Sequence, residues 1–133
     1  SEKLLGKVNA TLTEIKSTFK IKGVINMWGS LRDTFLITKE NSRQIPIIIF
    51  HGTKDLQMTY DSEFNSNKIS FGAYSIANRY KNLDACCSLI TKTGAKHGEG
   101  FSLDYRASQI SLFFKSVFCE TCHYSGKENN ENK

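Results

Sequence analysis

The sequence predicts an α/β fold, with about three parallel strands and flanking helices. The apolar run at residues 45–50 is rich in β-branched side chains, as is typical of a strand covered on both faces. A second apolar run, residues 86–90, follows some forty residues later, with a segment of helical spacing between the two. Such alternation of strands and helices favours parallel strands joined by right-handed crossovers.

Each of these runs ends in a polar turn. Asp55 follows the first run, and His97 follows the second. Ligands of open parallel sheets bind just beyond the carboxyl ends of the strands. We therefore expect the carboxylate and the imidazole to lie at the edge of the sheet where chemistry is usually found.

The first half of the chain contains one further strand and one helix. Residues 1–20 have apolar side chains at positions 8, 12, 15 and 19, a spacing that predicts an amphipathic helix. Residues 23–29 predict a strand between two glycines, and the polar stretch 34–44 is expected to be irregular. Pro46 is acceptable because it stands near the start of its strand.

The second half repeats the alternation. Residues 56–70 are rich in Asn and Ser and predict a surface loop near the site. Helical spacing then predicts one helix over 72–83 and, after the strand through Leu89, another over 103–117. The length of 133 residues suits one domain, over residues 1–118, followed by a polar tail at 119–133. Residues 125–133 are polar and charged without periodicity, so we expect this end of the tail to be frayed.

The four cysteines form two pairs in the sequence. Cys86 and Cys87 lie in a predicted strand and are expected to behave as small buried hydrophobes. Cys119 and Cys122, in the tail, predict a local disulfide or a pair of reduced thiols. With His123 they also match the C-x-x-C-H pattern of covalent haem attachment, but a tail offers neither an apolar pocket nor a second axial ligand, and zinc would require further ligands.

The distributions of charged and of apolar residues argue against two classes of partner. The net charge is +5, and the lysines are spread along the chain instead of forming a basic stripe with interleaved aromatics, so we expect no nucleic-acid interface. The longest uninterrupted apolar run, residues 45–50, is far shorter than the roughly 18 to 20 residues that span a bilayer, so we expect no membrane span.

Two motifs carry a resemblance to a known family. Residues 46–60, in which an apolar strand leads into His-Gly-Thr-Lys-Asp, resemble the acid-bearing strand and turn of α/β-hydrolases of the carboxylesterase kind. Residues 94–98, Gly-Ala-Lys-His-Gly, resemble the histidine loop of that family, and 23–29 resembles the strand before the acid strand. The likeness covers about residues 21–118. It departs from the family pattern at Gln57 and Thr59, where an apolar residue and a proline are usual.

The resemblance implies a serine-type ester hydrolase with the triad order Ser, acid, His. Asp55 would orient His97, and His97 would remove the proton of a serine hydroxyl and return it to the leaving group. The implied substrate is a small-molecule carboxylic ester, and the chemistry requires no metal or organic cofactor. Taken singly, Asp55 could merely cap a turn and His97 could be an ordinary loop residue, whereas His51 is expected to be a structural turn residue.

The sequence contains no motif that would supply the serine nucleophile. A nucleophile elbow reads Gly-x-Ser-x-Gly, and none of the 133 residues forms one; Ser30 follows a strand but lacks the second glycine. We therefore expect a C-terminal portion of a hydrolase domain that is inactive by itself and associates with the missing N-terminal half. The alternative is a non-catalytic hydrolase-like fragment that acts as a binding or interaction module.

Overall fold

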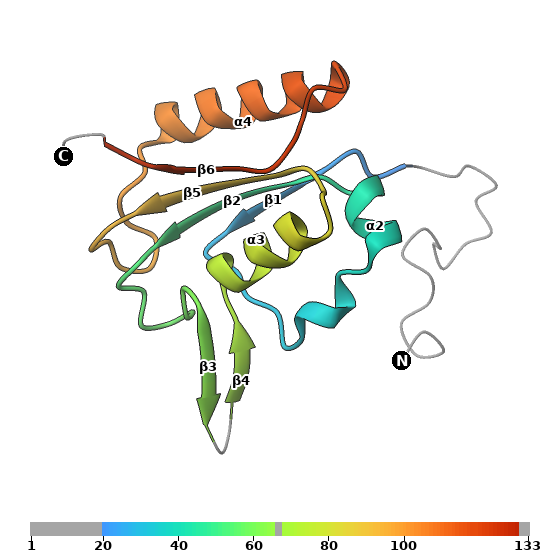
Figure 1. Ribbon diagram of the computed structural model, residues 1–133. Coiled ribbons are helices and arrows are strands. Elements are labelled where there is room, and N and C mark those ends of the chain that lie inside the picture. The colour runs from blue at the N-terminus through green and yellow to red at the C-terminus, as the bar shows by residue number, and fades with distance from the viewer. Residues whose placement is uncertain (1–19, 66–67, 131–133) are drawn as a thin grey trace, which may run out of the picture.

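The computed structural model describes residues 20–65 and 68–130, and it contains a four-stranded sheet in which every neighbouring pair is parallel (Figure 1). The strands are arranged in the order β1-β2-β5-β6. Their bounds are Val24–Met27 for β1, Ile47–Gly52 for β2, Cys87–Lys92 for β5 and Ser125–Glu128 for β6. The predicted α/β class with a parallel sheet is confirmed. The helix predicted over residues 1–20 lies outside the described residues, apart from its last position.

Helices cover both faces of this sheet (Figure 1). Helix α3, Ala73–Asn82, lies on one face, and helix α4, Leu103–Phe118, lies on the other. Both helices match segments with predicted helical spacing. Within residues 20–65 and 68–130, none of the helices combines the length and the apolar character required to cross a membrane.

Strand β2 forms the centre of both apolar layers. Successive side chains of a strand point to opposite faces. Ile47 and Ile49 therefore pack in the cluster on the α3 side, whereas Ile48 and Phe50 pack in the cluster on the α4 side. All six residues of β2 are buried, which explains why its sequence is apolar without alternation.

The stretch 34–44, which the sequence analysis expected to be irregular, contains two short helices. They are the 3-10 helix η1, Thr34–Leu36, and the α-helix α2, Lys39–Gln44. Thr38 and Asn41 form a reciprocal capping box, in which each side chain accepts a hydrogen bond from the backbone N–H of the other residue. This local pairing stabilises a helix that has no long apolar stripe.

The segment 56–70, predicted to be a loop, forms part of a hairpin. Strands β3, Ser62–Asn65, and β4, Lys68–Phe71, pair antiparallel and project from the body of the molecule (Figure 1). Only one face of such a hairpin meets the protein, so exposed side chains such as those of Phe64 and Ile69 remain on it. The polar composition of this segment therefore gave no indication of strands β3 and β4.

The tail was wrongly predicted to be frayed, because residues 125–128 form strand β6 beside β5. All four β6 residues are exposed, so hydrophobic patterning gave no sign of this strand.

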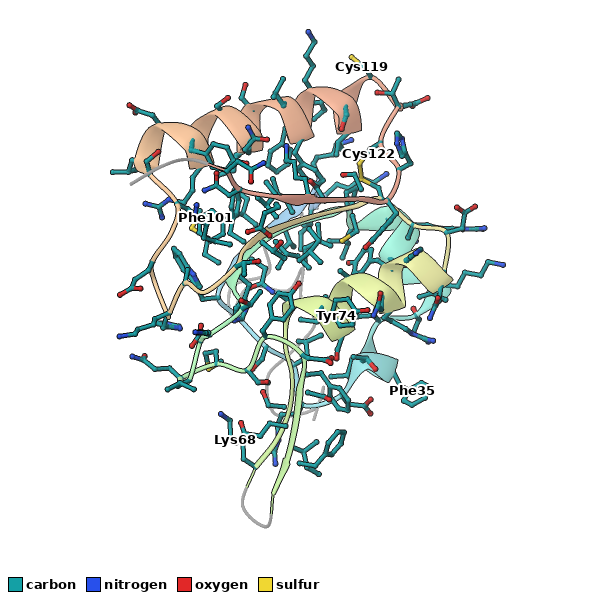
Figure 2. The ribbon with its side chains drawn as sticks, turned by 60° about the vertical axis from the view of Figure 1, so that its left-hand side comes forward. Phe35, Lys68, Tyr74, Phe101, Cys119 and Cys122 are labelled. Atoms are coloured by element: carbon teal, nitrogen blue, oxygen red, sulfur yellow. A yellow bond between two sulfur atoms is a disulfide. The ribbon has the colours of Figure 1, made fainter. Side chains whose placement is uncertain are left out.

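A disulfide joins Cys86, just before β5, to Cys122, just before β6. Cys119 is a free, exposed thiol at the end of α4 (Figure 2). The expected local pair of Cys119 with Cys122 is therefore wrong, whereas Cys87 is buried as predicted.

We predict that Cys122→Ser lowers the free energy of unfolding by about 2–4 kcal/mol, measured by urea denaturation under oxidising conditions. The lost cross-link spans 36 residues and limits the freedom of the unfolded chain. Cys119→Ser is the matched control and should change stability little, because this thiol is exposed and unpaired. Equal effects in the two variants would contradict the Cys86–Cys122 assignment.

Candidate active site

The structure brings Asp55 and His97 together at the carboxyl end of the sheet. Strands β2 and β5 are paired in parallel along their whole lengths, so their carboxyl ends lie side by side. Asp55 lies in the turn after β2, and His97 lies in the loop after β5. Nδ1 of His97 is 2.8 Å from Oδ2 of Asp55, which is hydrogen-bonding distance.

The carboxylate of Asp55 accepts hydrogen bonds at both oxygens. The backbone N–H groups of Gln57 and Met58 each donate to Oδ1 at 2.9 Å. Oδ2 lies 2.8 Å from His97 Nδ1 and 3.2 Å from Nε2 of His51. The side chain of Asp55 is fully buried, so these partners replace the water that the carboxylate loses on folding.

These partners determine the ionisation of Asp55. Burial by itself would raise the pKa of the Asp55 carboxyl. The N–H of Met58, the imidazole of His97 and the N–H of Gln57 outweigh burial, and the pKa is lowered from its usual value. Asp55 is therefore a stable anion that can hold an imidazole in one orientation.

The pairing also determines which nitrogen of His97 can act as a base. The ionised carboxylate of Asp55 can only accept a hydrogen bond, so Nδ1 of His97 carries the proton. In neutral imidazole the proton-free Nε2 then presents a lone pair. The His97 side chain is 34% exposed, so part of it remains accessible from outside. This arrangement can accept a proton from a hydroxyl group placed against Nε2.

His51 is a second, fully buried imidazole beside the acid. Its Nε2 lies 3.0 Å from the carbonyl oxygen of Met58, which can only accept, so Nε2 carries the proton. Nδ1 of His51 is buried without a hydrogen-bond partner. Burial lowers the pKa of His51, more than the Met58 carbonyl and the Asp55 charge raise it. His51 is thus a neutral donor that holds the acid turn, in agreement with its predicted structural role.

Hydrogen bonds join the acid turn to the histidine loop. The N–H of Lys54 donates to the carbonyl of Ala95, and the N–H of Gly94 donates to the hydroxyl of Thr53. Gly52 lies so close to Ala95 that a Cβ at this position would collide with the Ala95 carbonyl group. A glycine is therefore required there, because the two loops touch through their backbones.

Trp28 is a neighbour of His97 that the sequence analysis did not identify. It follows β1 and has a φ of 56°, a left-handed conformation that is rare for a large side chain. Its ring centroid is 6.1 Å from that of His97 and 6.1 Å from that of Phe101. Arg106 of α4 lies over the Trp28 ring at 5.7 Å. The strained backbone thus places an aromatic wall beside the imidazole.

Ser30, the serine considered from sequence, has a different partner. Its hydroxyl accepts a hydrogen bond from the Ser70 hydroxyl at 2.8 Å. Ser30 also lines a hollow of about 450 Å³ beside β1, whose apolar walls include Val24, Ile25 and Ile76. The structure therefore assigns Ser30 to the region between β1 and the hairpin, with no contact that would make it a nucleophile for His97.

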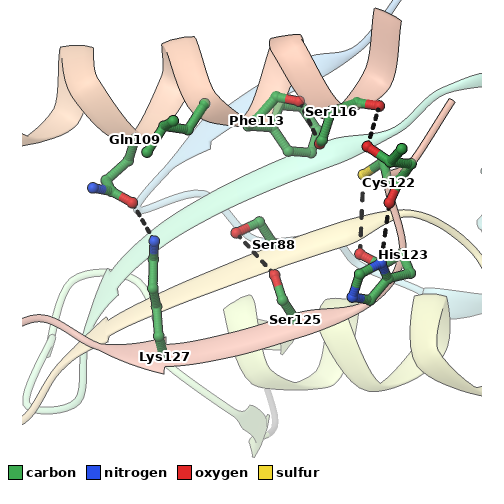
Figure 3. A pocket seen from close by; sticks show the side chains of 10 residues that line it. Ser88, Gln109, Phe113, Ser116, Cys122, His123, Ser125 and Lys127 are labelled. Atoms are coloured by element: carbon green, nitrogen blue, oxygen red, sulfur yellow. Dashed lines mark hydrogen bonds between the residues drawn. The ribbon is translucent and has the colours of Figure 1, made fainter. Parts of the chain in front are cut away.

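A smaller cavity, of about 220 Å³, lies between α4 and β6 (Figure 3). Ser125 donates to Ser88 across its floor, and Lys127 donates to Gln109 at one end. Cys122 lines this cavity, but its sulfur is bonded to Cys86 and is not available for a thioether to haem. In the described part of the chain, no three His, Cys, Asp or Glu side chains gather in a way that could hold a metal ion.

Comparisons with known proteins gave no relative: no family model, no curated protein and no solved structure matched the chain.

We predict that stability falls as the pH drops below about 6.5, the usual pKa of histidine. Because the folded-state pKa of His51 is lowered, the unfolded chain takes up this proton at a higher pH than the folded protein does. The contribution of His51 is therefore complete above that pH and declines below it. Urea unfolding between about pH 5 and pH 8 should show this slope, and His51→Gln should reduce it. An equal slope in the two proteins would contradict the buried neutral imidazole.

Proposed function

We propose that this chain is the acid-and-histidine portion of a serine-type carboxylic ester hydrolase of the α/β-hydrolase kind. The single observation that carries the proposal is the 2.8 Å contact between His97 Nδ1 and Asp55 Oδ2. Two features give this contact catalytic meaning. It lies at the carboxyl ends of adjacent parallel strands, where ligands of such sheets bind, and it leaves Nε2 of His97 as the nitrogen that faces a reactant.

The roles follow from the chemistry of acyl transfer. Nε2 of His97 removes the proton of a serine hydroxyl as the oxygen attacks the ester carbonyl, and the same nitrogen then protonates the leaving alcohol. Asp55 keeps the proton on Nδ1 and stabilises the imidazolium that forms during the reaction. The lowered pKa of Asp55 fits this role, because the acid must stay ionised while the imidazole is charged.

The serine and the oxyanion hole belong, in this proposal, to a segment that completes the sheet. The Gly-x-Ser-x-Gly motif is absent from the printed sequence. Among the described residues, β1 pairs with β2 alone, and its Val24 and Ile25 are 39% and 42% exposed. An edge strand with exposed apolar side chains and unpaired backbone groups is a template for another strand. The ester class itself rests on the resemblance of residues 46–60 and 94–98 to esterases.

The proposal predicts the kinetics of p-nitrophenyl acetate hydrolysis by the full protein that supplies the serine. His97→Ala and Asp55→Asn should each lower kcat on the order of 10³- to 10⁴-fold, because the first removes the base and the second removes its orienting acid. His123→Ala is the matched control and should leave kcat unchanged, because His123 is an exposed histidine distant in sequence from the pair.

The same assay includes a second comparison. The 133-residue chain alone should hydrolyse the ester no faster than its own His97→Ala variant, since no described serine is placed against His97 as a nucleophile. Equal kcat values for wild type and His97→Ala in the full protein would remove His97 from the mechanism and defeat the proposal.

A second candidate function is a non-catalytic binding module. The open β1 edge and the hollow of about 450 Å³ beside it favour this alternative, because both suit an added strand with apolar side chains. A module of this kind requires the β1 edge but not the Asp55–His97 pair. Full-length protein that shows no ester turnover, with a partner bound equally well by wild type and Asp55→Asn, would support the module.

A further inference from the structure

The end of β6 contacts the loop that carries His97. One carboxylate oxygen of Glu128, Oε1, accepts a hydrogen bond of 2.6 Å from the backbone N–H of Thr93. The other oxygen, Oε2, accepts one of 2.8 Å from the hydroxyl of Thr91. Glu128 therefore holds the chain at the point where β5 ends and the histidine loop begins.

Asn129 joins the two ends of the same loop. Its side-chain amide donates a hydrogen bond of 2.6 Å to the carbonyl of Gly100. Its backbone N–H donates to the carbonyl of Thr91, and its own carbonyl accepts from the ammonium of Lys92. Asn129 is only 1% exposed although it lies in the polar tail. A fully buried amide of this kind has a specific structural purpose, because burial without partners would be costly.

The loop between these two ends contains three glycines in a left-handed conformation. Gly94, Gly98 and Gly100 all have φ values between 77° and 87°, in the left-handed region where glycine is favoured. Glycine adds backbone freedom that must be restricted if a side chain is to be placed within a fraction of an ångström. His97 lies midway between Thr93, which Glu128 contacts, and Gly100, which Asn129 contacts.

We propose that Asn129 is a positioning residue for His97, and that with Glu128 it fixes the histidine loop so that Nδ1 of His97 stays within hydrogen-bonding distance of Asp55. The catalytic meaning of this role rests on the proposed function, whereas the positioning itself does not. Asn129 acts on the loop through its hydrogen bonds to the backbone at Gly100 and Thr91.

The anchorage of β6 supports this role. A strand of four exposed residues gains little stability from apolar burial. It is held at its start by the Cys86–Cys122 disulfide and along its length by the backbone ladder to β5. The covalent link and the loop contacts thus lie at opposite ends of β6. Because β6 is held at its start and along its length, its far end can restrain the position of the histidine loop.

The test is nuclear magnetic resonance of the 133-residue chain labelled with ¹⁵N-histidine. The Nδ1–H of a histidine that donates to a carboxylate gives a downfield proton signal, which His97→Gln assigns by removing it. Asn129→Leu keeps a similar side-chain volume but cannot donate to Gly100. The Nδ1–H of His97 should then exchange with water about tenfold faster or lose its signal, because one hydrogen bond that holds the loop is missing.

Ser125→Ala is the matched control, because it removes a side-chain hydrogen bond from the other end of the same strand. It should leave the His97 signal unchanged. If Asn129→Leu does not fold, the exposed Glu128→Ala decides by the same signal. A folded variant at 129 or, failing that, at 128 with wild-type exchange would overturn the positioning role while leaving the proposed function intact. A wild-type protein without the signal would contradict the Asp55–His97 pair and therefore both proposals.

Discussion

A buried carboxylate is costly unless the folded chain replaces its water, and the surroundings of Asp55 are arranged to do so. Two backbone N–H groups and two imidazoles point at its oxygens. The turn after β2 supplies the amides, β2 itself supplies His51, and the loop after β5 supplies His97. Each of these segments is therefore held in place partly by the same charge. His51 is buried as a neutral donor beside this carboxylate, and Gly52 allows the acid turn and the histidine loop to approach through their backbones.

The sheet determines where this carboxylate can lie. The parallel pairing of β2 with β5 places both carboxyl ends at one edge, so residues 42 positions apart in sequence meet after similar turns. The alternating side chains of β2 lock its register, because Ile48 and Phe50 must face α4 while Ile47 and Ile49 face α3. A slip by one residue would reverse these faces and move Asp55 away from His97. The apolar core thus sets the geometry of the polar site.

Much of this arrangement could be predicted from the sequence. The unbroken apolar run at 45–50 is a strong sign of a doubly covered strand, and the helical spacing at 72–83 and 103–117 identified α3 and α4. Strand β6 could not be predicted, because Ser-Gly-Lys-Glu has no apolar pattern. The strand depends on backbone pairing with β5 and on the disulfide from Cys122 to Cys86, 36 residues earlier. Trp28 was missed for a related reason. Its contact with His97 depends on a left-handed backbone at Trp28 and on the approach of the loop after β5 to the end of β1, and neither can be read from the spacing of apolar residues.

The ionisation of Asp55 tests the central claim most directly. In protein labelled with ¹³C at the aspartate carboxyl carbon, titration of the Asp55 signal should give a pKa below the usual 3.8, because three hydrogen bonds to the anion outweigh its burial. A pKa of Asp55 at or above 3.8 would show that the donors do not hold the anion, and would contradict the account of the site.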